Sequence, residues 1–338
     1  MMSTVIESGM YVSLTKEEYS IIQNDIELFR TNCVGRYAAN GQRYTVNGFM
    51  NIVFVNMERK DSGELTLSKQ RKRKGIGMNI KLNRDVVEKL RDAGLDPMKK
   101  SSSECSAYYM QFIEAYCRLP LTGREMIFYR VICERLEDSI KLHHFLRIKK
   151  NDGQSVNILP FAVKQADEIH KNYLIGFSLK KRSNGYRYKN TLCVPLRKII
   201  DCRRVASLDP EKDIHFGKNS VFSCYRDLKS YIQNRLVTDG VLYLGGKLMN
   251  VTVRLSNTGI KKLSEHTLFR PVFTSDKNDE HIIYFRATRL QTFKYFFQFG
   301  SDAEILEPGE YREEFSNAYR SAFELYSQKK TVTVKETD

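Results

Sequence analysis

Residues 171–200 read KNYLIGFSLKKRSNGYRYKNTLCVPLRKII, and this stretch decides the fold that the sequence predicts. An apolar run over residues 173–179 predicts a strand, and a second run over 192–196 predicts another. The residues between these runs, 180–189, are rich in Lys and Arg and predict a basic loop. We therefore expect two strands of a β-domain that carries positive charge on the connection between them.

The distribution of charge along the chain singles out the same region. The 338 residues contain 55 Lys and Arg against 40 Asp and Glu, a net charge of +15. Residues 139–205 hold 15 basic and 4 acidic residues, a net charge of +11, whereas residues 1–138 hold 21 against 18 and residues 206–338 hold 19 against 18. A basic segment with so few acids predicts a polyanionic partner, with a solvated surface as the alternative. Nucleic acid fits better than a membrane, because no amphipathic apolar face accompanies the charge.

The residues before this stretch complete a small β-domain. Residues 145–149 and 155–159 predict two strands joined by the turn Asn151-Asp152-Gly153. Together with the strands at 173–179 and 192–196 they place a basic β-domain over residues 139–205.

The order of signals in this domain resembles the WYL domain, an Sm-like five-stranded β-barrel of prokaryotic regulators. Three segments carry the resemblance: Leu159-Pro160-Phe161, then Asn172-Tyr173-Leu174-Ile175-Gly176-Phe177, then residues 194–199. Asn172 stands where the family has tryptophan, which removes one stacking surface. Either Arg197 or Lys198 stands for the arginine of the family's Arg-Ile pair.

The resemblance implies that the domain binds a ligand, often nucleic acid, in a positively charged groove. Cations neutralise phosphates and aromatic rings stack on unpaired bases. Tyr186 and Tyr188 either stack in this way or pack inside the barrel. The candidate nucleic-acid contacts are Arg147, Lys149, Tyr173, Lys180, Lys181, Arg182, Arg187, Arg197, Lys198, Arg203 and Arg204.

Residues 1–120 predict a separate N-terminal region. Thr15 and Glu18 form a capping box that opens a helix, residues 49–55 predict a strand, and residues 69–74 form a basic arm. Apolar residues alternate over 76–82, which is the period of a half-buried strand.

A short helix capped by Asn83 and a second helix from residues 101–103 follow this strand. Strand, short helix and longer helix over about 75–118 resemble the ribbon-helix-helix family, in which two chains pair their strands into a ribbon that enters the DNA major groove. The candidate ribbon contacts are Gly77, Asn79 and Lys81.

The remaining segments complete an α+β multidomain fold. Thr122 and Glu125 predict a capping box for a connector helix over residues 121–138. Residues 206–330 predict a C-terminal α+β unit with a strand at 251–255, a helix at 258–264 and a last helix from Tyr311. Residues 296–300 (FFQFG) and 304–308 (EILEP), followed by a final helix to Tyr326, resemble the extension that follows many WYL domains. We expect this unit to form a dimer interface. We expect residues 331–338 to be a disordered tail.

The sequence predicts no enzyme, metal site or cofactor. It contains no P-loop, no G-x-G-x-x-G, no G-x-S-x-G elbow and no Cys/His ligand spacing. The adjacent His143 and His144 would face opposite sides of a strand and could not converge on one phosphate. An odd number of cysteines, seven, and the lack of a membrane-spanning run or signal peptide predict a reducing, cytoplasmic location.

The combination of segments is similar to the WYL accessory proteins of type VI-D CRISPR systems. The resemblance implies a non-enzymatic homodimer that binds single-stranded RNA through the WYL domain and stimulates a CRISPR RNA-guided ribonuclease. The alternative is a WYL-family transcriptional regulator that reads DNA with the ribbon and senses a ligand with the barrel. A scaffold that only dimerises a partner is a third reading.

Overall fold

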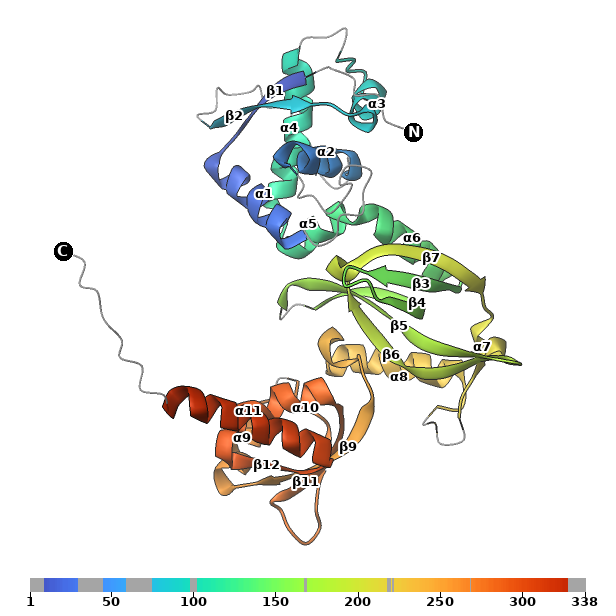
Figure 1. The fold of residues 1–338 in the computed structure, drawn as a ribbon, viewed down its shortest axis with the longest axis vertical. Coiled ribbons are helices and arrows are strands. Elements are labelled where there is room, and N and C mark those ends of the chain that lie inside the picture. The colour runs from blue at the N-terminus through green and yellow to red at the C-terminus, as the bar shows by residue number, and fades with distance from the viewer. Residues whose placement is uncertain are drawn as a thin grey trace, which may run out of the picture. The chain divides into compact units, whose positions relative to one another are not determined.

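The structure, a computed structural model, describes residues 9–29, 45–58, 75–97, 102–166, 169–217, 220, 222–267 and 269–327. It shows a mixed α+β protein of two compact units (Figure 1), which confirms the predicted fold class at this level. The first unit comprises residues 1–189 and 194–217, and the second comprises residues 190–193 and 218–338. The basic arm at 69–74, Ser101 and the expected tail at 331–338 lie outside the described residues.

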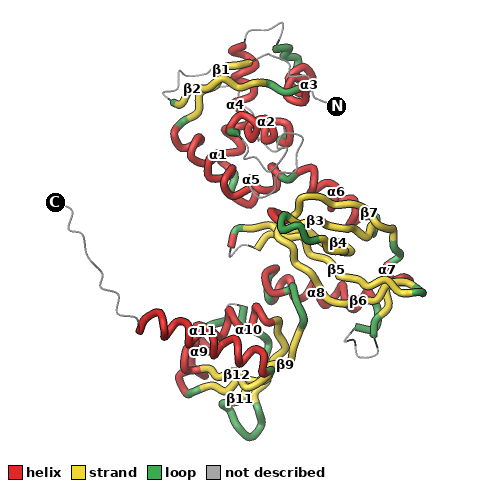
Figure 2. The backbone as a smooth tube through the Cα atoms, viewed as in Figure 1, coloured by secondary structure: helices red, strands yellow, loops and turns green. Residues whose placement is uncertain are grey.

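The N-terminal region contains the same strand-helix-helix pattern twice. The first copy is β1 (Gly9–Leu14), α1 (Lys16–Phe29) and α2 (Val46–Asn56), and the second is β2 (Ile76–Lys81), α3 (Arg84–Asp92) and α4 (Ser102–Arg118). β1 and β2 pair antiparallel along their full length, from Gly9 opposite Lys81 to Leu14 opposite Ile76 (Figure 2). The expectation that two chains form the ribbon is therefore corrected, because β1 of the same chain occupies the position of the second strand.

Local sequence determines where several of these helices begin. The Thr15 backbone N–H donates to Glu18 (2.8 Å) and the Glu18 N–H donates to the Thr15 hydroxyl (3.1 Å), which confirms the capping box. The Asn83 side chain accepts from the Val86 N–H at 2.9 Å, as expected for the cap of α3.

The predicted strand at 49–55 is wrong, because these residues belong to helix α2. Their Phe, Val and Ile content is typical of strands, but the Thr45 hydroxyl accepts from the Gly48 N–H and caps a helix. Phe49, Val53 and the residues next to them are buried at three- and four-residue spacing, which is the period of a packed helix.

The connector consists of two helices, α5 (Leu121–Phe128) and α6 (Arg130–Lys141), rather than the predicted single one. α5 begins after Pro120, and no side chain caps it. The predicted capping box of Thr122 and Glu125 is therefore wrong. Glu125 is fully buried and binds residues of the central sheet instead.

The central sheet has six strands: β3 (His144–Lys150), β4 (Ser155–Ala166), β5 (Lys171–Arg182), β6 (Gly185–Pro195), β7 (Ile199–Ser207) and β8 (Ile214–His215). Their order is β7-β3-β4-β5-β6-β8, so within the described residues β7 and β8 are free edges. The expected five-stranded closed barrel is corrected to an open six-stranded sheet, in which β7 and β8 are strands that the sequence analysis did not locate. A short helix, α7 (Pro210–Asp213), precedes β8.

The sheet is nevertheless strongly curved. Residues 155–158 of β4 pair with β3, and residues 159–166 pair with β5, so that β4 bends and joins two halves. The ring centroids of Phe145 on β3 and Tyr186 on β6 are 5.1 Å apart, although β4 and β5 lie between these two strands in the sheet. Adjacent strands are about 4.8 Å apart, so a flat sheet would hold these rings much farther from each other.

Gly176 permits the bend. It lies opposite Pro160, next to the irregularity in β4, and a Cβ at this position would stand 2.5 Å from the Leu159 carbonyl oxygen. A side chain therefore cannot be added without moving the backbone of β4.

The second unit packs helices on a four-stranded antiparallel sheet. Its elements are α8 (Tyr225–Thr238), β9 (Leu248–Leu255), α9 (Asn257–Glu265), β10 (Phe273–Ser275), β11 (Ile282–Thr288), α10 (Arg289–Phe296), β12 (Ala303–Glu307) and α11 (Gly309–Ser327). The strand order is β10-β11-β9-β12. The predicted strand at 251–255, the helix at 258–264 and the last helix from Tyr311 are confirmed within a few residues at their ends.

Candidate nucleic-acid interface

The first group of candidate residues lies on the β5–β6 hairpin. The predicted basic loop over 180–189 is wrong, since β5 extends to Arg182 and β6 begins at Gly185. Strand geometry therefore fixes the backbone of these cations more firmly than a loop would. The exposed hairpin cations are Lys180, Lys181, Arg182, Arg187 and Lys189.

Arg187 has a defined position on this hairpin. It lies opposite His215 in the parallel pairing of β6 with β8. Its guanidinium lies against Gly217, where an added Cβ would come within 2.3 Å of Nη2. His215 contacts the Asn184 carbonyl oxygen through Nε2 at 2.7 Å, which ties β8 to the hairpin turn.

The second group lies on strands β3 and β7. Arg147 stands directly opposite Arg203 across the two strands, and Asn157 of β4 stands on its other side. Two residues further along β3, Lys149 stands opposite Asp201 of β7. Like charges directly opposite each other destabilise a sheet, so this arrangement favours the binding of an anion between the two arginines.

Few of these cations have an acidic partner. Arg203 pairs with Asp201 at 2.7 Å, and Arg204 lies 3.5 Å from the His144 ring through Nη1. Within the described part of the chain, no acidic side chain forms an ion pair with Arg147, Lys149, Lys180, Lys181, Arg182, Arg187 or Lys198. This surface therefore carries positive charge that the protein itself does not neutralise.

Arg197 and Lys198 have opposite surroundings. The Arg197 side chain is only 12% exposed, and its Nε donates to Glu125 of α5 at 2.6 Å. Its guanidinium also lies over the Phe29 ring at 5.4 Å. Lys198 is exposed, so it is the residue of this pair that a ligand can reach.

The residues at the WYL tripeptide position are buried as well. Asn172 donates to Glu125 from its backbone N–H (2.9 Å) and its side-chain amide (2.8 Å), and the amide also donates to the Thr122 carbonyl. Tyr173 is 8% exposed, too little for its ring to stack on a base. Asn172 therefore attaches the sheet to α5, and neither of these buried side chains is available to a nucleic acid.

The two tyrosines of the hairpin pack inside the curved sheet. Tyr186 contacts Phe145, and Tyr188 contacts Phe177 (6.2 Å) and Phe216 (5.6 Å). The sequence left open whether these rings stack on bases or pack inside the domain, and their contacts favour packing.

The N-terminal ribbon presents a second polar face. Gly77, Asn79 and Lys81 are exposed, and the sequence analysis missed that β1 adds Tyr11, 61% exposed, directly opposite Asn79. The backbone of Lys81 is held by Asn47, whose side chain both accepts from its N–H (2.8 Å) and donates to its carbonyl (3.3 Å). The position of this face is thus fixed by α2.

The residues that the structure describes contain no cluster of three or more His, Cys, Asp or Glu that could hold a metal ion. Their helices include none that combines the length and the apolar character needed to cross a bilayer. Burial raises the pKa of Cys117, Cys133 and Cys193 to about 12, which makes these thiols unreactive.

No protein-family model matches this sequence, and no curated protein matches it. Among solved structures, the chain is similar to a protein described as "a CRISPR Cas-related protein", with a TM-score of 0.65, 14% identity and coverage of 96% of this chain and 95% of the other. It is also aligned with proteasome accessory factor B/C (PafBC) of Arthrobacter aurescens, at a TM-score of 0.31, 13% identity and coverage of 68% and 33%. The first comparison shows a shared fold over nearly the whole chain, and the second is too weak to support a shared fold.

Proposed function

We propose that this chain is a non-enzymatic, cytoplasmic accessory protein of a CRISPR system that binds single-stranded RNA on its central sheet and stimulates an RNA-guided ribonuclease. The observation that carries the proposal is the set of exposed cations without acidic partners on β3, β5 and β6. The shared fold with a CRISPR Cas-related protein supports the CRISPR association. Assignment of the central sheet to the WYL family belongs to the same proposal, and neither a metal nor a cofactor is needed for it.

The arrangement favours contacts to the RNA backbone over reading of bases. Guanidinium and ammonium groups neutralise phosphates, whereas the rings of Tyr186 and Tyr188 are occupied by packing. A single strand is flexible and can follow a strongly curved sheet, while a duplex is stiff over about 150 base pairs. We therefore expect tight binding of single-stranded RNA with little sequence preference.

Binding of the full chain to single-stranded RNA, single-stranded DNA and duplex DNA, measured by fluorescence anisotropy over a salt series, tests the proposal. We expect the tightest binding to single-stranded RNA and a steep loss of affinity with salt, because phosphate neutralisation releases counterions. In a second arm, the chain is added to an RNA-guided ribonuclease, and RNA cleavage should accelerate. Selective binding of one palindromic duplex with weak RNA binding contradicts the proposal.

A transcriptional regulator is the second candidate function. The observation in its favour is the complete ribbon within one chain, whose outward side chains include Tyr11, Asn79 and Lys81. A two-stranded ribbon fits the DNA major groove. Replacing Asn79 and Lys81 by Ala should abolish operator binding if the chain is a regulator, and should leave RNA binding nearly unchanged if it is an RNA-binding accessory protein.

We further propose that the chain is a homodimer formed through its C-terminal unit. At the end of α11, Phe323 is 73% exposed and Tyr326 is 88% exposed. Such rings on a helix favour contact with an identical helix of a second copy. Light scattering should give the mass of a dimer for the native chain and of a monomer for the double variant Phe323→Ser and Tyr326→Ser. A native monomer contradicts this proposal.

A further inference from the structure

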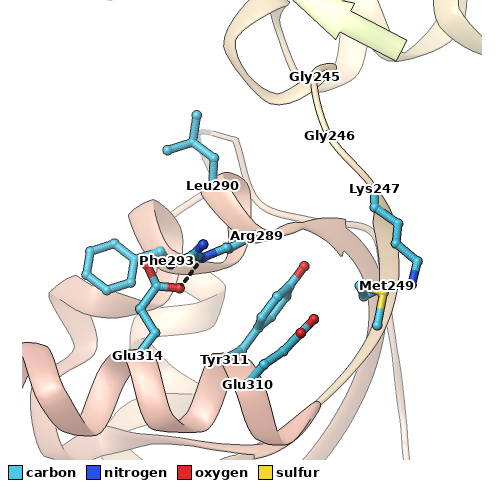
Figure 3. Close-up of a pocket in the computed structure, with 10 residues that line it drawn as sticks. All are labelled: Gly245, Gly246, Lys247, Met249, Arg289, Leu290, Phe293, Glu310, Tyr311 and Glu314. Carbon is cyan, nitrogen blue, oxygen red and sulfur yellow. Dashed lines mark hydrogen bonds and ion pairs between the residues drawn. The ribbon is translucent and has the colours of Figure 1, made fainter. Parts of the chain in front are cut away.

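A cavity of about 690 Å³ lies within the C-terminal unit, and its lining includes none of the residues discussed as nucleic-acid contacts. It is bounded by residues 245–249 before and within β9, by the first turns of α10, and by the first turns of α11 (Figure 3). Its volume falls in the range of about 300–1,000 Å³ that is typical of small-molecule sites.

Tyr311 provides the first indication of a ligand. The residue is 3% exposed, and Figure 3 shows its hydroxyl pointing into the cavity. No described residue forms a hydrogen bond with this hydroxyl, in contrast to Tyr295, which donates to the His266 carbonyl (2.6 Å), and Tyr319, which donates to the Phe297 carbonyl (3.0 Å). A buried hydroxyl without a hydrogen-bond partner is unfavourable, and a ligand in the cavity can supply that partner. Burial raises the pKa of Tyr311, so the group remains protonated and able to donate.

Of the four charged side chains that line the cavity, two form an ion pair with each other and two do not. Arg289 pairs with Glu314 at 2.6 Å, and this pair closes one side (Figure 3). Glu310 and Lys247 also line the cavity, and neither forms an ion pair with another described residue. The site thus offers one carboxylate acceptor, one phenol and one ammonium group to a ligand.

The rest of the lining is apolar. Met249, Leu290 and Phe293 contribute side chains, and the Tyr311 ring adds an aromatic surface. An inorganic anion would be repelled by Glu310 and would leave the apolar lining side chains exposed to water. A purely apolar ligand would remove water from the Glu310 carboxylate without offering it a hydrogen-bond donor. The cavity therefore suits a molecule with apolar faces, a hydrogen-bonding edge and a separate negative charge.

We infer that this cavity binds a nucleotide, with the base against the apolar wall, its N–H groups donating to Glu310, its edge meeting the Tyr311 hydroxyl, and the phosphate near Lys247. Bases with an exocyclic amino group offer Glu310 more donors than uracil does. The nucleotide is either free or one residue of an RNA strand, since both carry the same groups. This inference goes beyond the proposed function, which places RNA on the central sheet.

Isothermal titration of the full chain with AMP and with UMP tests the inference. AMP should bind saturably and more tightly than UMP. Tyr311→Phe and Glu310→Gln keep the volume of the side chains, and each should weaken AMP binding about 3- to 10-fold, since one hydrogen bond contributes about 0.5–1.5 kcal/mol and 1.4 kcal/mol is a factor of ten. The matched control is Tyr284→Phe, whose exposed phenol donates to Asp276 outside the cavity, and it should bind AMP like the native chain.

A parallel titration with a short oligoadenylate distinguishes the two sources. Weaker oligoadenylate binding in Tyr311→Phe identifies a nucleotide within a strand, and an effect on AMP alone identifies a free nucleotide. A triple variant, Lys180→Ala, Lys181→Ala and Arg182→Ala, should still bind AMP, so that failure of the sheet as an RNA site leaves this inference intact. The inference is overturned if neither AMP nor UMP binds saturably, or if binding is equal in the native chain, Tyr311→Phe and Glu310→Gln.

Discussion

The central sheet and the C-terminal unit differ in how often their exposed cations form ion pairs with acidic side chains. In the C-terminal unit, Arg254 and Arg312 share Glu304 (3.1 and 2.6 Å), and Lys262 pairs with Asp302 (2.8 Å). On the central sheet, most exposed cations lack such partners, and two arginines even stand opposite each other. Paired cations are neutralised by the protein itself, whereas unpaired ones are available to a polyanion. The contrast explains why the net charge of a region is a better guide to binding than its number of basic residues.

Arg197 shows that the same distinction applies within the sheet. Its charge is neutralised by Glu125, which is itself fully buried, so this arginine belongs with the structural cations despite its position in the basic segment. The predictions below test the division between structural and available cations, starting with the largest expected effect.

Removal of Glu125 should have the largest effect. In Glu125→Ala, Arg197 remains nearly buried without its carboxylate, and Asn172 loses its acceptor. Breaking a buried pair in this way costs about 3–5 kcal/mol of unfolding free energy. Urea denaturation measures the loss. Glu304→Ala, which removes an exposed partner of two arginines, is the control and should cost less than about 1 kcal/mol. Equal losses in the two variants would contradict the distinction.

Neutralising the hairpin cations should instead affect binding. The triple variant Lys180→Ala, Lys181→Ala and Arg182→Ala removes three exposed charges and no ion pair. At about 1 kcal/mol for each phosphate contact, affinity for single-stranded RNA should fall about 100-fold. The slope of log K against log salt should become shallower by about 2, because each single-strand contact contributes about 0.7.

The control for this variant is Arg254→Ala with Arg312→Ala, which removes paired cations of the other unit. It should leave RNA affinity and the salt slope unchanged. An equal loss of affinity in both variants would mean that total charge, and not the unpaired surface, drives binding. Unfolding free energy should stay within about 0.5 kcal/mol of the native value in the hairpin variant.

Removing an acid from the sheet should strengthen RNA binding modestly. Asp201 neutralises Arg203, so Asp201→Asn releases one more cation opposite Arg147. We expect about 2- to 5-fold tighter binding, corresponding to about 0.5–1 kcal/mol. Asp209→Asn, which frees Lys212 on α7, serves as the control and should change little. Unchanged or weaker RNA binding in Asp201→Asn would place Arg203 outside the interface.

The smallest effect concerns acid stability of the C-terminal unit. Hydrogen bonds from Lys262 and Ser256 lower the pKa of Asp302. A lowered pKa in the folded state gives stability that is present above the unfolded value of about 3.9 and is lost as the pH falls through the folded value. The difference in unfolding free energy between the native chain and Asp302→Asn should therefore shrink below about pH 4. Denaturation of both at several pH values measures it, and a constant difference would contradict the assignment.

Local patterns predicted much of this fold. The capping box at Thr15 and Glu18, the Asn83 cap and the alternation over 76–82 each depend on neighbours within a few residues, and each formed as expected. The same kind of evidence failed at residues 49–55, where β-branched composition competed with a cap and a helical pattern of burial. It also failed at Glu125, whose spacing from Thr122 imitates a capping box while its true partners are 47 and 72 residues away.

The sequence by itself determined the location of the excess charge, since this is a property of composition that no folding can move to another segment. Tertiary structure alone decided that β1 completes the ribbon, that Arg197 turns inward while Lys198 stays exposed, and that Tyr311 opens into a cavity. These outcomes depend on contacts between residues far apart in the chain, such as Gly9 with Lys81. The energy of such contacts exists only after the chain has folded, so no local pattern records it.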